Sequence, residues 1–167
     1  MKAGVEIAPL DRHDAREFVE AGLASRALHG RWVSPPLDLD AFLQKLDCMR
    51  APVNYGFTVR RADTRALAGY VDVTNVVRGI FLTGYVGYYA FTGHERQGLM
   101  TEGLRRVVRY AFMDLGLHRL EANMQPGNLA SIALATACGF SQEGYSPRYL
   151  KIRGRWRDHA RWAIVAL

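Results

Sequence analysis

The chain has 167 residues, 49% of them hydrophobic and 23% charged, which suits one folded domain with a core of its own. Its net charge of +6 fits a nucleic-acid binder, an enzyme with an anionic cofactor or a protein with an acidic partner. It holds no apolar run of about 18 residues, the length that crosses a bilayer, and no apolar leader follows Met1. We therefore expect a cytoplasmic protein with no membrane partner.

The first half of the chain predicts three strands and two helices. Alternating or continuous apolar segments predict strands at Val5–Leu10, Tyr55–Arg61 and Leu67–Val76, the last two joined by a turn at 62–65. Apolar residues that recur every three to four positions predict helices at Asp11–Ala24 and Asp38–Met49. The aspartate that opens the first helix is expected to cap it, because its side chain can accept a hydrogen bond from a free N–H there.

The second half predicts a long buried strand, one strongly amphipathic helix and a closing hairpin. The expected elements are a strand at Ile80–Phe91, a helix at Thr101–Leu115, a strand at Arg119–Met124, a helix at Asn128–Cys138, and strands at Gln142–Ile152 and Trp156–Val165. Early antiparallel strands followed by one strand–helix–strand crossover indicate an α/β (α+β) fold. We expect one domain over 1–167, with a mixed, mostly antiparallel sheet flanked by helices.

The cysteines and histidines of the chain give no metal-ligand spacing. His94-Glu95 begins like a zinc helix, but the second histidine of that motif is missing. We therefore expect no metal site. Cys138 lies at a predicted helix end, and we expect it to be a buried free thiol.

The segment from Arg96 to Thr101 joins the predicted long strand directly to the amphipathic helix. It contains Gly98, and a glycine turn that opens a helix leaves backbone N–H groups free at the helix start. Those groups and the helix dipole form a site suited to phosphate. The simpler interpretation is an ordinary connection with a helix cap and nothing bound.

Four further motifs follow this segment in order. They are Arg119-Leu120-Glu121-Ala122, Asn128-Leu129-Ala130-Ser131, Ala137-Cys138-Gly139-Phe140 and Gly154-Arg155-Trp156-Arg157-Asp158-His159-Ala160-Arg161-Trp162. Together with the glycine segment they resemble the GNAT superfamily of acetyl-CoA-dependent N-acetyltransferases. The resemblance is to the RimJ/RimL-type branch, which acetylates the N-termini of ribosomal proteins, and it runs from about Tyr85 to the end of the chain.

The resemblance implies the GNAT fold and a binding site for acetyl-CoA as cosubstrate. It places the pyrophosphate on the backbone of the glycine segment, the pantetheine arm along the end of the long strand, and a further pantetheine contact on an asparagine. The residues implied are Arg96, Gln97, Gly98, Leu99, Met100, Thr101, Tyr88, Tyr89, Ala90 and Asn128. Two positions depart from the superfamily pattern, since Glu95 replaces its first residue and Met100 its last small one. A carboxylate at Glu95 would weaken phosphate binding if it faced the site.

Acetyl transfer requires a neutral amine, and an α-amino group with a pKa near ~8 is neutral in roughly a tenth of molecules at pH 7. A base therefore helps the reaction. The resemblance implies Glu121 as that base and Ser131 as the group that assists the departing sulfur. Other branches place a tyrosine at the position of Ala135, which leaves Ser131 as the better candidate, with Tyr145 and Tyr149 as alternatives that the sequence does not place. The alternatives are a structural Arg119–Glu121 ion pair and, for Ser131 and Asn128, helix capping.

The last motif carries two further residues with chemical potential. Asp158 and His159 are adjacent in a predicted strand, so their side chains point to opposite faces and cannot form a catalytic dyad. We interpret them as structural or acceptor-site residues. Trp156 and Trp162 are expected to pack rather than to contact a cofactor.

The sequence thus predicts an acetyl-CoA-dependent N-acetyltransferase whose acceptor is a protein N-terminal amine. One alternative is the same fold acting on a small-molecule amine. Another is a non-catalytic acyl-CoA-binding module or a basic nucleic-acid binder, although the scattered arginines predict no direct nucleic-acid partner. The resemblance also suggests a homodimer, since family members often pair through their strands.

Overall fold

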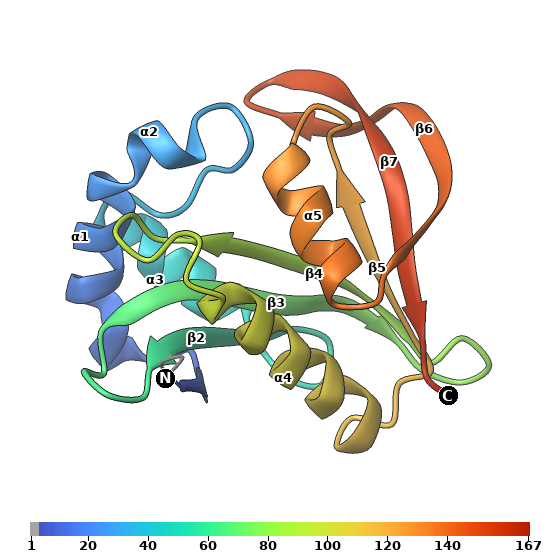
Figure 1. Cartoon of the computed structure of the whole chain (residues 1–167), viewed down its shortest axis with the longest axis horizontal. Coiled ribbons are helices and arrows are strands. Elements are labelled where there is room, and N and C mark those ends of the chain that lie inside the picture. Colours follow the sequence, from blue (N-terminus) through green and yellow to red (C-terminus); the bar gives the residue numbers. More distant parts are fainter. Residues whose placement is uncertain (1–3) are drawn as a thin grey trace.

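The structure is a computed structural model that describes residues 4–167, and its centre is one sheet of seven strands (Figure 1). In spatial order β1-β2-β3-β4-β5-β7-β6, the neighbours pair antiparallel except β4 and β5, which run parallel. The strands are β1 (Val5–Pro9), β2 (Tyr55–Arg61), β3 (Leu67–Val77), β4 (Thr83–Ala90), β5 (Arg119–Met124), β6 (Ser141–Ile152) and β7 (Arg155–Val165). The predicted α/β fold with a mixed, mostly antiparallel sheet is confirmed.

Helices cover both faces of this sheet (Figure 1). One face carries α4 (Leu99–Met113) and α5 (Leu129–Ala137), and the other carries α1 (Ala15–Ala24), the single turn α2 (Arg26–His29) and α3 (Leu39–Cys48). Alternate residues of β3 pack against the helices on the two faces of the sheet, because successive strand side chains point to opposite faces. Val71 packs in the cluster under α4, whereas Tyr70 packs with Phe18 of α1 and Phe42 of α3.

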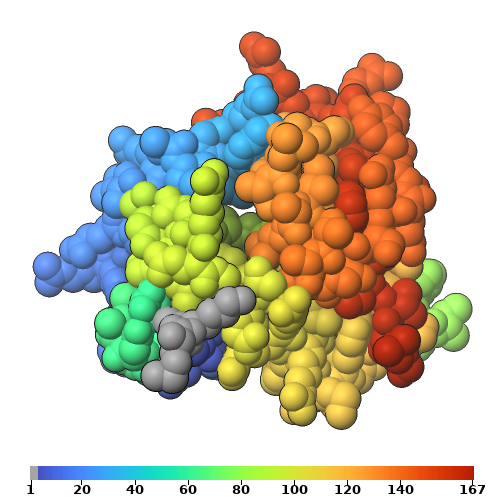
Figure 2. All heavy atoms as spheres, in the orientation of Figure 1, coloured from blue at the N-terminus to red at the C-terminus, as the bar shows by residue number. Residues whose placement is uncertain are grey.

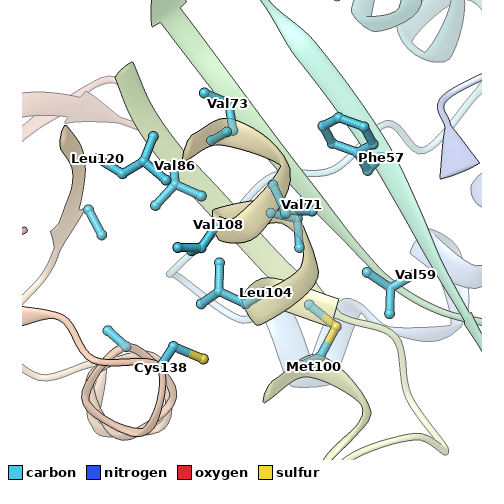
Figure 3. Packing of buried hydrophobic residues seen from close by; sticks show 14 of the residues in the cluster. Phe57, Val59, Val71, Val73, Val86, Met100, Leu104, Val108, Leu120 and Cys138 are labelled. Atoms are coloured by element: carbon cyan, nitrogen blue, oxygen red, sulfur yellow. The ribbon is translucent and has the colours of Figure 1, made fainter. Parts of the chain in front are cut away.

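The helix α4 buries the face that its sequence predicts (Figure 3). Leu104, Val107 and Ala111 are fully buried and Val108 is nearly so, against β2, β3 and β4. Gly98, in a left-handed conformation at φ +78°, precedes the helix, which therefore begins at Leu99, earlier than expected. The predicted free thiol at Cys138 is confirmed and is buried in the same cluster.

The predicted strand at Ile80–Phe91 was wrong at its start. The strand β4 begins at Thr83, and the preceding apolar pair is exposed, Ile80 by 97% and Phe81 by 64%. The chain turns here between β3 and β4, with φ +73° at Gly79 and φ +45° at Leu82. Apolar side chains thus occupy a solvent-exposed hairpin turn, which a reading of hydrophobicity alone does not distinguish from a buried strand.

The predicted helix at Asp11–Ala24 is divided in the structure. Asp11 caps the start, because its carboxylate accepts a hydrogen bond from the N–H of His13 at 2.8 Å. The carboxylate of Asp14 in turn accepts from the N–H of Asp11. This capping box opens a short 3₁₀ turn, η1 (Arg12–Asp14), and α1 follows it. The helix α2 was not predicted.

The strands β4 and β5 pair only at their beginnings. Thr83 to Tyr85 lies beside Arg119 to Glu121, and beyond these positions the two strands diverge (Figure 1). Residues 86–90 therefore run along β3 on one side without a partner strand in β5 on the other. This divergence creates the space that holds the candidate site.

A substitution at Gly103 of α4 tests how the helix packs on the sheet. A Cβ at this position would lie 2.7 Å from Cγ1 of Val59 in β2, so Gly103→Ala should overpack the core. Overpacking costs about 1–3 kcal/mol, and the better helix propensity of alanine returns about 1 kcal/mol. We expect a net loss of roughly 1 kcal/mol in the free energy of unfolding, measured by urea denaturation.

The double variant Gly103→Ala/Val59→Ala is the control, because it removes the methyl groups that clash. Its loss in the free energy of unfolding should be smaller than the sum of the losses in the two single variants. A loss in the double variant equal to that sum would contradict the contact between residue 103 and Val59.

Candidate active site

Two adjoining cavities lie where β4 and β5 diverge. The larger, of about 680 Å³, opens between the loop that precedes α4 and the helix α5, and Figure 2 shows it as a hollow between the yellow-green and orange segments. The smaller, of about 140 Å³, lies between β4, β5 and the β6–β7 hairpin. Five residues line both cavities, namely Trp32, Val33, Tyr88, Asn128 and Ser131. The two cavities therefore meet beside these side chains.

The loop at the entrance to the larger cavity has the backbone of an anion site. Arg96 and Gly98, which line the cavity, adopt left-handed conformations, with φ of +59° and +78°, and Gly93, outside the lining, does so at +87°. Alternation of right- and left-handed residues turns successive N–H groups toward one side, which forms a concave binding surface for anions. No side chain caps the start of α4, so the first amides of this helix keep their hydrogen-bonding capacity.

Glu95 lies in this loop and turns its charge onto the loop itself. Hydrogen bonds from the backbone N–H of Glu95, and then from those of Gly93 and His94, lower the pKa of its carboxyl group. The hydroxyl of Thr92 also donates to it, at 3.3 Å. Glu95 lines the larger cavity and these hydrogen bonds favour its ionised form, so the conflict with phosphate expected at this position remains.

The predicted cofactor residues gather around the larger cavity with one exception. Its lining includes Tyr88, Tyr89, Ala90, Arg96, Gly98, Leu99, Met100, Thr101 and Asn128. Gln97 is absent from this lining, because its side chain binds the carbonyl of Gly93 at 3.0 Å and the guanidinium of Arg61 at 2.7 Å. It braces the loop against β2, and its predicted cofactor contact would have to come from its backbone.

The end of β4 is held on both of its faces. His29 of α2 hydrogen-bonds the carbonyl of Ala90 at 2.7 Å through Nε2, and burial lowers the pKa of this histidine, so the neutral ring donates. On the opposite face, the hydroxyl of Tyr88 donates to the carbonyl of Ser131 at 2.8 Å. Burial raises the pKa of Tyr88 to about 12, so this proton stays in place at neutral pH and ties α5 to β4.

Ser131 lies where the two cavities meet, and its hydroxyl is not a helix cap. Asn128 caps α5, since its Oδ1 accepts a hydrogen bond from the N–H of Ser131 at 3.3 Å. The Ser131 Oγ atom forms no hydrogen bond within residues 4–167. The capping alternative is therefore correct for Asn128 and does not apply to the side chain of Ser131.

Glu121 occupies the last position at which β5 pairs with β4, opposite Tyr85. Its carboxylate accepts from Nε of Arg119 at 2.8 Å and lines neither cavity. Arg119 also contacts Glu143, and the hydrogen bonds to Glu143 and then to Glu121 raise the pKa of this guanidinium. The structural ion pair is present, and the role of Glu121 as a base stays a prediction.

The smaller cavity contains His159, which is expected to be a structural or acceptor-site residue, and Asn123, for which the sequence indicates no role. Asn123 of β5 and His159 of β7 line it, and His159 is only 3% exposed. Asp158 turns to the other face, where it accepts from the hydroxyl of Tyr145 and the N–H of Arg148. The prediction that Asp158 and His159 form no dyad is confirmed.

The two tryptophans of the last motif differ in environment. Trp162 packs against the main core, as predicted. Trp156 is 60% exposed near the tip of the β6–β7 hairpin, so its predicted packing role was wrong. It lies two positions beyond Gly154 of the hairpin turn.

In the part of the chain that the structure describes, no helix combines the length and the apolar composition that a membrane span requires. Among residues 4–167, no group of three or more His, Cys, Asp or Glu side chains is arranged to hold a metal ion.

The comparison with known proteins agrees with this geometry. The family model for the acetyltransferase (GNAT) domain matches residues 5–141. The probable N-acetyltransferase YjcK of Bacillus subtilis (strain 168) is 40% identical over 111 residues, which are 66% of this chain and 61% of that protein. The [ribosomal protein uS5]-alanine N-acetyltransferase of Escherichia coli (strain K12) is 39% identical over 103 residues, 62% of this chain and 53% of that protein. The matches thus span somewhat more than half the length of these relatives.

A solved structure shares the whole architecture. Mycobacterium smegmatis RimJ in complex with CoA-disulfide superposes with a TM-score of 0.88 and 25% sequence identity, covering 97% of this chain and 82% of that one. The family model covers most of the chain, including β4, the glycine loop and α5. The chain belongs to the acetyltransferase (GNAT) family.

Proposed function

We propose that this protein transfers the acetyl group of acetyl-CoA to the α-amine of a protein N-terminus by direct attack within a ternary complex. The observation that carries the proposal is the junction of the two cavities beside Tyr88 and Ser131. A cofactor in one cavity and an amine in the other would meet there without leaving the protein. Membership of the GNAT family and the similarity to a ribosomal-protein acetyltransferase support the same conclusion. A ribosomal-protein acceptor would place the enzyme in the cytoplasm.

The larger cavity offers contacts to both the pyrophosphate and the pantetheine arm of acetyl-CoA. Its loop offers free N–H groups at Gly98 to Thr101 for the pyrophosphate. The unpaired edge of β4 at Tyr88 and Tyr89 can hold the pantetheine arm as an added strand would be held, although the Ala90 carbonyl already binds His29. Acetyl-CoA, when bound, supplies the acetyl group as a thioester.

The residues at the junction account for the other requirements of the reaction. Holding the amine against the thioester carbonyl converts a bimolecular step into an effectively unimolecular one, which alone supplies a large rate enhancement. A new N–C bond forms as the C–S bond breaks, and negative charge develops on sulfur. The free hydroxyl of Ser131 can donate a hydrogen bond to that sulfur.

The smaller cavity favours an α-amine over a polyamine. No aspartate or glutamate lines it, so a second or third positive charge on the acceptor would find no counter-charge. Arginines also surround the lining residues: Arg153 bonds the carbonyl of Val33, and Arg155 and Arg157 pair across the hairpin with residues of the lining. An α-amine is neutral in a larger fraction than a lysine or polyamine nitrogen, and it carries one charge at most.

The first prediction concerns the phosphate loop. Gly98→Val should weaken coenzyme A binding measured by calorimetry, because a β-branched side chain at φ +78° strains the loop and obstructs approach to the free amides. Gly93→Val is the matched control: it has φ +87° and similarly open surroundings, but Gly93 does not line the cavity. Equal loss of affinity in the two variants would show that strain, and not contact with the phosphate, causes the effect.

The second prediction concerns Ser131. Ser131→Ala should lower kcat by about 100-fold with little change in coenzyme A affinity, because the lost interaction strengthens only as charge develops on sulfur. Since Asn128 caps the helix, the free energy of unfolding should change by less than about 0.5 kcal/mol. A variant with wild-type kcat would exclude the role on sulfur, and Ser131→Thr, which keeps the hydroxyl, serves as control.

The third prediction concerns the acceptor. Release of free thiol from acetyl-CoA should be rapid with peptides that carry a free N-terminus and slow with spermidine. The same peptides blocked at the N-terminus should not react, although their lysines remain free. Faster turnover of spermidine would favour the small-molecule alternative, and coenzyme A binding without thiol release from any amine would favour a non-catalytic binding module.

A further inference from the structure

Two hydrogen-bond acceptors without partners lie in the lining of the smaller cavity. The Oδ1 atom of Asn123 is buried and receives no hydrogen bond from residues 4–167. The Nδ1 atom of His159 lies 2.9 Å from the carbonyl of Arg157. A carbonyl can only accept, so Nδ1 carries the proton of the neutral ring, and Nε2 keeps an unshared electron pair. Within the described part of the chain, Nε2 has no hydrogen-bond partner.

The sheet brings these two atoms to the same space. Asn123 of β5 lies opposite Arg161 of β7, and His159 is two residues from Arg161 along the same strand. Residues two apart in a strand share a face, so Asn123 and His159 are diagonal neighbours, about 7–8 Å apart between their Cα atoms. Both line the smaller cavity together with Ser131.

The chemistry of Asn123 Oδ1 and His159 Nε2 favours a ligand that donates hydrogen bonds. Oδ1 of an amide and the free nitrogen of a neutral imidazole accept and do not donate, so each remains unsatisfied until an N–H or O–H group approaches. No carboxylate lines the cavity to compensate a full positive charge. A neutral primary amine carries two N–H groups and fits both conditions.

We propose that the smaller cavity binds the acceptor amine, with its two N–H groups donated to Asn123 Oδ1 and His159 Nε2, and that His159 takes the proton released in acetyl transfer. This proposal rests on the proposed function and adds the catalytic base to it. The Glu121 carboxylate lines neither cavity and is bound to Arg119. His159 replaces it in this role.

The amine nitrogen attacks the thioester carbonyl carbon and forms the N–C bond, and one of its protons moves to Nε2 of His159. The C–S bond then breaks, and the electron pair leaves with sulfur, which takes a proton from solvent through the hydroxyl of Ser131. The imidazolium returns its proton to solvent. The products are the acetylated amine and free coenzyme A.

Titratable side chains lie on more than one side of His159. The ring of Tyr149 on β6 packs edge-on against it, with centroids 6.2 Å apart, and Tyr88 of β4 lines the same cavity. Asp158 precedes it on β7 but turns to the opposite face. Asp158→Asn is therefore a matched control for changes to the strand that leave the cavity untouched.

The kinetic test compares His159→Gln with the wild type, with acetyl-CoA and an N-terminal peptide as substrates. The variant should lose about 100-fold in kcat, keep its coenzyme A affinity, and lose the acidic limb of the profile of kcat/KM against pH. Asp158→Asn should keep that limb. The proposal is overturned if His159→Gln keeps the limb, and in particular if Glu121→Gln removes it instead.

A second measurement needs no turnover and no variant. NMR of protein with ¹⁵N-labelled histidine should show His159 with its proton on Nδ1. The signal of Nε2 should then shift when the peptide is added together with coenzyme A that carries no acetyl group. An unshifted Nε2 with bound peptide overturns the proposal. A shift without turnover on acetyl-CoA would keep the amine site and reject the proposed acetyl transfer.

A substitution at Asn123 tests the amine site independently of His159. Asn123→Leu, which removes an acceptor and keeps the volume, should weaken peptide binding about tenfold and leave coenzyme A affinity unchanged. Unchanged peptide affinity in this variant would contradict the placement of the amine beside Asn123.

Discussion

The site depends on one interaction beneath β4, the hydrogen bond from the N–H of Gly87 to the carboxylate of Asp72 at 3.2 Å. Asp72 is mostly buried in β3, and Nζ of Lys45 on α3 approaches it to 3.6 Å. Burial raises the pKa of this carboxyl group and Lys45 opposes that effect, and one of its oxygens is the acceptor under β4. Only glycine leaves room for it, because a Cβ at Gly87 would lie 2.8 Å from the Asp72 oxygen.

This hydrogen bond holds β4 to β3 two residues beyond the point where β4 leaves β5. Gly87 pairs with Asp72 of β3, and β4 and β5 separate after Tyr85 and Glu121. The separation exposes the edge of β4 to the larger cavity and opens the smaller one beside β5. The Tyr88–Ser131 hydrogen bond then spans the gap and fixes α5 at the junction. A buried carboxyl group in β3 thus lies beneath the strand that carries the site.

Much of the fold follows from local patterns, and the amine site does not. The spacing of Leu104 and Val107 identified the buried face of α4, and Gly98 identified the turn before it, because both features depend on neighbouring residues alone. The Ile80–Phe81 turn was misread since hydrophobicity does not reveal a reversal of the chain. Asn123 and His159 meet only through the pairing of β5 with β7. Asp72, a carboxylate inside an apolar strand, was a signal that sequence reasoning overlooked.

The central claim is that the amine and the thioester meet at the junction of the two cavities. A crystal structure with a bisubstrate analogue, in which coenzyme A is joined through an acetyl linker to the α-nitrogen of a peptide, tests it most directly. The pyrophosphate should lie on the amides from Gly98 to Thr101, and the linked nitrogen should lie in the smaller cavity within hydrogen-bond reach of Asn123 or His159. A peptide that leaves the junction over Arg119 and Glu121 instead would contradict the account.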